Sequence, residues 1–139
     1  MFRFILAVTL TTLVTACAQT PEAGKSPSIT DITWQLVRVD GQEIAQVGTE
    51  PAYLRLTHEG RAEGYGGCNR FFGQYRQTGD EIKFMPLAST RRACPTGMME
   101  EDTFLKALGS VQNWQQQNGV LRLYDASGKL LLELEEKKP

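Results

Sequence analysis

The side chains with the clearest capacity for chemistry are two cysteines, Cys68 and Cys94. In an exported protein such a pair is normally a disulfide, and closing a loop of about 26 residues would stabilise the fold by roughly 3.5 kcal/mol. A redox couple is the alternative, and Arg91 and Arg92 would give Cys94 a positive setting. Redox pairs usually have C-x-x-C spacing, which is absent here. The sequence therefore favours a structural disulfide.

Other arrangements that support catalysis or metal binding are weak in this sequence. The single histidine, His58, has no paired ligand spacing with the cysteines, so we expect no metal site. No Gly-x-Ser-x-Gly motif occurs, and no persuasive serine or acid lies near His58. The acidic run at residues 100–102 is explained by a solvated helix start, where the helix dipole favours negative charge. The sequence predicts no enzyme and no cofactor, although a pair of carboxylates for glycoside chemistry stays open.

The glycines at positions 64, 66 and 67 raise the question of a phosphate-binding loop. They are not followed by Gly-Lys-Ser/Thr and do not form G-x-G-x-x-G. Glycines within a strand more often mark a bulge or a close approach of two backbones. We therefore expect the pair Gly66-Gly67 to shape the backbone.

The beginning of the chain has the composition of a signal peptide. Arg3 precedes an apolar run at residues 4–14, and small residues follow. A run of this length is shorter than the roughly 20 residues that span a bilayer as a helix. The segment Val14-Thr15-Ala16-Cys17 resembles a bacterial lipobox, which implies cleavage before Cys17 and lipidation of its sulfur; plain secretion is the alternative. By resemblance to Gram-negative lipoproteins, Ala18 implies transfer to the outer membrane.

These features predict three parts of the chain. Residues 1–16 would be the signal peptide, and residues 17–30, rich in Pro, Gly, Ser and Thr, would be a lipidated tether. Residues 31–136 are then enough for one hydrophobic core. The formal net charge is −1 and no basic stripe is present, which argues against a nucleic-acid partner. Membrane attachment would rest on the N-terminal lipid, because no polybasic cluster is present.

Alternation of apolar and polar residues and frequent turn signals predict antiparallel strands from residue 32 onward. The pair Asn118-Gly119 is the strongest hairpin signal. We expect strands at residues 32–39, 53–58, 61–65, 71–76, 81–85, 114–117, 120–124 and 129–134. Residues 96–109 carry apolar side chains at helical spacing, with Gly109 at the end, and predict one short helix packed on the sheet. Strands this close together predict a meander that curls into a sandwich or an open barrel.

The segment at residues 66–75 resembles the hallmark G-C-N-x-F-x-G-x-Y of the META domain, the HslJ-like family of heat-shock lipoproteins. The family motif then comprises Gly67, Cys68, Asn69, Phe71, Gly73 and Tyr75, with Thr90 and Cys94 as a downstream T-x-x-x-C element. The resemblance covers residues 31–135. It implies an α+β fold, an antiparallel sheet curled into an open (cracked) barrel with one short helix. It also implies an association with heat shock and novobiocin resistance, and it supplies no catalytic residues.

The sequence supports two alternative functions. The first is a non-enzymatic lipoprotein on the periplasmic face of the outer membrane, which acts in envelope stress or assembly through contacts with another envelope protein. Arg70, Arg91 and Arg92 are candidates for its contact surface. The second is a binder of a small hydrophobic or lipid ligand in a barrel cavity, with Met98, Met99 and Phe104 as adaptable lining.

The aromatic residues are relevant to the choice between a contact surface and a ligand cavity. Five of them could line a cavity: Tyr65, Phe71, Phe72, Tyr75 and Phe84. Aromatic side chains in a small β-domain are more often part of the core. Asn69 is expected to shape the motif loop, because asparagine readily bonds its own backbone and tolerates left-handed conformations.

Overall fold

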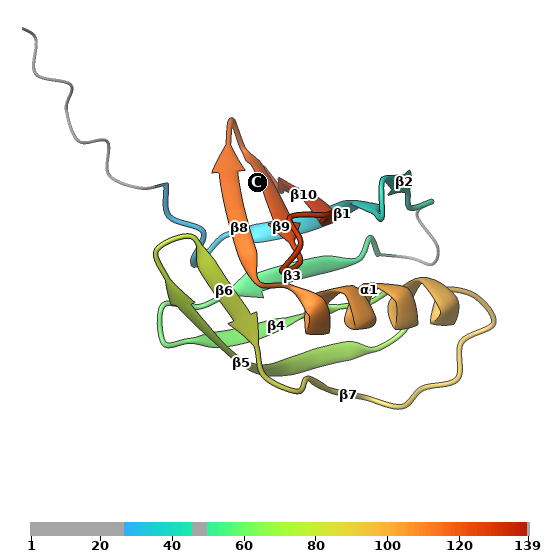
Figure 1. The fold of residues 1–139 in the computed structure, drawn as a ribbon. Coiled ribbons are helices and arrows are strands. Elements are labelled where there is room, and N and C mark those ends of the chain that lie inside the picture. The colour runs from blue at the N-terminus through green and yellow to red at the C-terminus, as the bar shows by residue number, and fades with distance from the viewer. Residues whose placement is uncertain (1–26, 46–49, 139) are drawn as a thin grey trace, which may run out of the picture.

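The computed structural model describes residues 27–45 and 50–138 and shows an antiparallel barrel with one helix (Figure 1). Eight strands follow one another around the barrel, and the last pairs with the first. They are β1 Thr33–Val39, β3 Tyr53–Leu56, β4 Arg61–Tyr65, β5 Arg70–Thr78, β6 Glu81–Phe84, β8 Asn113–Gln117, β9 Val120–Tyr124 and β10 Leu130–Glu136. Two short strands lie outside this ring: β2 Gln42–Glu43 pairs with β1, and β7 Ala88–Ser89 pairs with β5. The predicted α+β barrel is confirmed.

Two bulges help the sheet to close. The register between β1 and β10 passes from Leu36↔Leu134 to Arg38↔Glu133, so Val37 is an extra residue. Leu131 is the extra residue between β10 and β9. Bulges bend a strand and increase its twist, which favours closure. Strand pairing around the ring is least extensive between β6 and β8, which share one paired position. The opening expected in the barrel corresponds best to this place.

The interior of the barrel is filled by apolar side chains. The alternation read from the sequence places Leu54 and Leu56 of β3 inside, both fully buried. The helix α1, Met98–Ser110, adds Phe104 and Leu108 to this core. Phe104 meets Phe71 of β5 edge to face, with ring centroids 5.6 Å apart. No helix in the described ranges is long and apolar enough to cross a bilayer.

Several predicted ends differ from the structure by one or two residues, including the start of the helix, which is Met98 and not residue 96. Two further differences bear on the packing. The helix continues past Gly109 to Ser110 and stops at Val111, whose extended backbone still donates a hydrogen bond to the Leu108 carbonyl. The folded part also begins before residue 31, because Ile29 is 1% exposed and its carbonyl accepts the Trp34 indole N–H at 2.9 Å. A single apolar residue in a polar stretch gives no periodicity, so the sequence could not place it in the core. Residues 1–16 and Cys17 lie outside the described residues.

Gly64 and Gly109 should respond in opposite ways to alanine. A Cβ at Gly64 would overlap the Tyr53 carbonyl oxygen and lie 2.5 Å from Cζ of Phe71. We expect Gly64→Ala to lower the free energy of unfolding by about 2–3 kcal/mol through overpacking. A Cβ at Gly109 meets nothing within 4 Å, so Gly109→Ala should raise it by about 0.5–1 kcal/mol. Urea denaturation of both variants checks this pair, and equal stabilities would contradict it.

Candidate functional site

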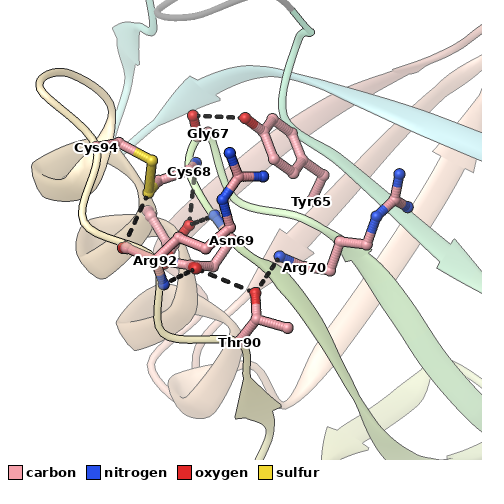
Figure 2. The surroundings of a disulfide bond; sticks show 9 residues. Tyr65, Gly67, Cys68, Asn69, Arg70, Thr90, Arg92 and Cys94 are labelled. Atoms are coloured by element: carbon pink, nitrogen blue, oxygen red, sulfur yellow. Dashed lines mark hydrogen bonds between the residues drawn. A yellow bond between two sulfur atoms is a disulfide. The ribbon is translucent and has the colours of Figure 1, made fainter.

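Five residues of the family motif lie together at one end of the barrel (Figure 2): Gly67, Cys68, Asn69, Thr90 and Cys94. Three segments meet there: the loop between β4 and β5, residues 90–97, and the first turn of α1. Cys68 and Cys94 form a disulfide with their Cα atoms 5.9 Å apart. The predicted structural disulfide is therefore present, and it joins the first of these segments to the second.

Glu101 ties the first turn of α1 to the motif loop. Its side chain is buried, and it accepts hydrogen bonds from the backbone N–H of Cys68 at 3.1 Å and of Asn69 at 2.5 Å. The expectation of a solvated acidic run is wrong for this residue. Successive helical residues point in different directions, so one of three consecutive acids turns inward. Its position three residues before Phe104 was the available signal, because residues i and i+3 share a helix face.

Asn69 connects all three segments through its side-chain amide. Its Oδ1 accepts hydrogen bonds from Thr90 Oγ1 at 3.0 Å and from the Arg92 backbone N–H at 2.6 Å. Its Nδ2 donates to Glu101 Oε1 at 2.9 Å and to the Arg92 carbonyl at 3.3 Å. Asn69 is not among the residues with positive φ. Asn69 shapes the loop as expected. The expected bonding to its own backbone is wrong, because its partners lie about 20 to 30 residues away along the chain.

The glycines of this corner allow two backbones to touch. Gly67 and Gly97 have φ of 121° and 89°, and a Cβ at Gly97 would lie 2.6 Å from the Gly67 carbonyl oxygen. A Cβ at Gly66 would lie 2.5 Å from Cγ of Glu101. Close backbone approach, the interpretation made from the sequence, is confirmed.

The remaining motif residues support the barrel wall. Phe71 packs on α1, and a Cβ at Gly73 would lie 2.7 Å from Cδ2 of Leu87. The Tyr75 hydroxyl donates to the Thr57 carbonyl at 2.9 Å. Across the described residues, every buried side-chain nitrogen and oxygen has a hydrogen-bond partner. The motif is thus occupied with internal contacts.

Tyr75 should make the fold sensitive to alkali. Burial raises the pKa of its phenol, and the charge of Asp31 adds to this. In the unfolded chain the phenol ionises near pH 10, so its contribution to stability is present below about pH 10 and is lost as the pH rises toward the folded pKa. Tyr75→Phe should cost about 1 kcal/mol at neutral pH, the value of a lost hydrogen bond, yet reduce the alkaline decline. Thermal melting between neutral pH and pH 11 tests this, and parallel curves for both proteins would contradict it.

The predicted ligand lining is not assembled in the structure. Phe104 is fully buried, whereas Met98 and Met99 are 52% and 79% exposed. Of the five aromatic residues considered, three are in the core, Tyr65 is half-buried and Phe72 is exposed.

One surface hollow, of about 380 Å³, borders Met99, Glu100 and Thr103 on the outer face of α1, and Phe104 does not line it. Two other hollows lie away from the helix. One of about 560 Å³ has a mainly charged and polar lining that includes Arg55 and Glu136. Another, of about 450 Å³, lies beside Pro27, the turn at Gly79 and Asp80, and the polar strand β8. Neither is lined by Phe71 or Phe104, so neither opens into the core around α1.

His58 lies on an exposed turn after β3, and its Nδ1 is 3.0 Å from Oδ2 of Asp31. Within residues 27–45 and 50–138, no group of three or more His, Cys, Asp or Glu side chains is placed to hold a metal ion.

Comparison with known proteins identifies a family and a shared fold. The family model of the META domain matches residues 27–138. A search of curated proteins found no match. Among solved structures, an NMR structure of a protein from Burkholderia xenovorans is similar, with 28% identity and a TM-score of 0.62, over 80% of this chain and 85% of that one.

Two further structures share the fold. One NMR structure has 22% identity and a TM-score of 0.61, over 77% of this chain and 90% of the other. A DUF4847 family protein from Bacteroides vulgatus has 14% identity and a TM-score of 0.59, over 80% and 96%. The motif residues, the barrel and the match over residues 27–138 lead to one conclusion: this chain belongs to the META domain family.

Proposed function

We propose that the protein is a lipoprotein of the outer membrane, facing the periplasm, that acts through contacts with another envelope protein and catalyses no reaction. Its role would be accessory, in envelope stress or assembly. The observation that supports this proposal is that the motif side chains make their contacts within the protein. The polar groups of the motif bond one another, and its aromatic residues fill the core. Contacts on the outer surface are then the means of action that the geometry supports best.

The anchor rests on the lipobox-like run that ends at Cys17. Metabolic labelling with palmitate should mark the wild-type protein and not Cys17→Ser. The matched control is a Cys68→Ser/Cys94→Ser double variant, which removes the other two cysteines and should keep the label. Equal labelling of the wild type and Cys17→Ser would remove the anchor from the proposal.

The mode of action needs a separate test. A photo-crosslinking amino acid at the exposed position Phe72 should give a discrete cross-linked protein in intact envelopes, and the same amino acid at exposed Gln77 serves as a control. A bound lipid in the purified protein, found by native mass spectrometry in place of a protein cross-link, would favour the ligand-binding alternative. Turnover of a thiol or ester substrate, lost on mutation of Cys68, would overturn the absence of catalysis.

A further inference from the structure

Three exposed arginines lie on the two segments that the disulfide joins: Arg70, Arg91 and Arg92, which we name the arginine corner. They come from two segments in direct contact, because the Thr90 N–H donates to the Arg70 carbonyl at 2.9 Å and the Arg92 N–H donates to Asn69. Among the described residues, none of the three has a carboxylate oxygen within 4.0 Å, whereas four other arginines do: Arg38, Arg55, Arg61 and Arg122. The arginine corner therefore carries positive charge that the fold leaves uncompensated.

Aromatic side chains extend the arginine corner across the sheet. Tyr65 is opposite Arg70 in the register of β4 and β5, and Tyr53 is opposite Tyr65. The Arg70 guanidinium donates to the Tyr53 hydroxyl at 3.2 Å. Phe72, on the same face of β5 two residues after Arg70, is 57% exposed. Arginine, tyrosine and phenylalanine are the residues enriched where proteins bind one another.

The arginine corner lies at the opposite end of the barrel from the point where the N-terminal segment joins it. Arg70 and Thr78 are the two ends of the nine-residue strand β5. At about 3.4 Å per residue these ends are roughly 27 Å apart. Pro27 borders a hollow with Gly79, directly after Thr78, and Figure 1 shows the blue start of the described chain at that end. A lipid on Cys17 would thus be tethered to the end of the barrel opposite the arginine corner.

The backbone that carries the arginine corner is held in place. The disulfide, the Asn69 amide and the Glu101 carboxylate fix the two segments to each other and to α1. In Figure 2, the side chains of Arg70 and Arg92 both extend toward the side on which Tyr65 lies. A pre-ordered surface loses less entropy when it binds, which favours its use as a docking site.

We propose that the arginine corner, with Tyr53, Tyr65 and Phe72, docks a carboxylate-rich segment of a partner protein. The guanidinium group matches a carboxylate with two parallel hydrogen bonds, and three guanidinium groups without a carboxylate partner call for several carboxylates in one segment. The neighbouring aromatic rings would cover the apolar parts of the same segment. This inference rests on the proposed function and deepens it, because it identifies the contact surface and the chemistry of the partner.

Binding of a fluorescein-labelled peptide of twelve residues, alternating glutamate and tyrosine, tests the proposal on the purified full chain in neutral detergent. We expect R70Q/R91Q/R92Q to bind at least tenfold more weakly than the wild type at moderate salt. The matched control is R61Q/R76Q/K83Q, which removes three exposed positive charges elsewhere on the barrel surface and should bind like the wild type. Thermal melting of both variants should stay close to the wild type, because the side chains that change are exposed.

Three outcomes would overturn the proposal: no binding by the wild type, an equal loss in both triple variants, or displacement of the peptide by anionic phospholipid vesicles while neutral vesicles have no effect. The last would assign the arginine corner to lipid headgroups. The peptide-binding result can be distinguished from the result of the palmitate labelling. Cys17→Ser should bind the peptide like the wild type, even if the labelling shows no lipid.

Discussion

A Glu101→Ala variant is expected to lose about 4 kcal/mol of unfolding free energy, the largest loss we expect from one substitution. The carboxylate accepts hydrogen bonds from two backbone N–H groups and from the Asn69 amide, all at the base of the motif loop. Hydrogen bonds to a charged group contribute about 1.5–3 kcal/mol each, and a donor left buried without a partner costs about 1–3 kcal/mol. Three donors would lose their acceptor together. Urea denaturation followed by tryptophan fluorescence measures the loss.

The neighbouring residue provides the control. Glu100 is half-buried and Asp102 is exposed, and neither accepts a hydrogen bond from the motif loop. Glu100→Ala should therefore change stability by no more than about 0.5 kcal/mol, as is usual at surface positions. If the Glu101 and Glu100 variants unfold at the same urea concentration, the carboxylate does not hold the loop.

Removal of the disulfide is expected to have the second largest effect. The two cysteines are 26 positions apart, so a Cys68→Ala/Cys94→Ala variant frees a loop of that length in the unfolded chain. The chain-entropy account gives a loss of about 3.5 kcal/mol. Calorimetric melting should show a large fall in the melting temperature of the variant.

A reductant provides the control for this measurement. It should lower the melting temperature of the wild type toward that of the double variant and leave the variant itself unchanged. Two reactive thiols in the wild-type protein isolated from the envelope, besides any at Cys17, would show that the disulfide does not form there.

The strands could be predicted because one face of each is buried. Leu54 and Leu56 are buried on either side of the exposed Arg55, and Asn118-Gly119 supplies the backbone of a tight turn, with φ of 54° and 76°. The bulges at Val37 and Leu131 could not be predicted in the same way. A bulge depends on the registers of two strand pairs that are distant in sequence, and no local pattern reports on it.

Part of the site could also be predicted from the sequence, and part could not. The disulfide and the motif residues follow from cysteine counting and from a resemblance. The network that joins the Asn69 side chain to Thr90, Glu101 and the Arg92 backbone consists of contacts between residues 21 to 32 positions apart. The acidic run at the start of the helix suggested that Glu101 is solvated. Its burial results from the packing of α1 against the motif loop, which no local pattern shows.

The position of β1 has a mechanical consequence. This strand follows the N-terminal segment and is hydrogen-bonded on both sides, to β10 and to β3. If the chain is pulled at its start while the arginine corner is held, the force runs mainly along the strands and loads these bonds in shear. Bonds in shear must break together, which keeps the rate of forced unfolding low, and that rate governs survival under load. Ile29 and its contact with Trp34 would give way first, so the link to the barrel can lengthen before the barrel opens.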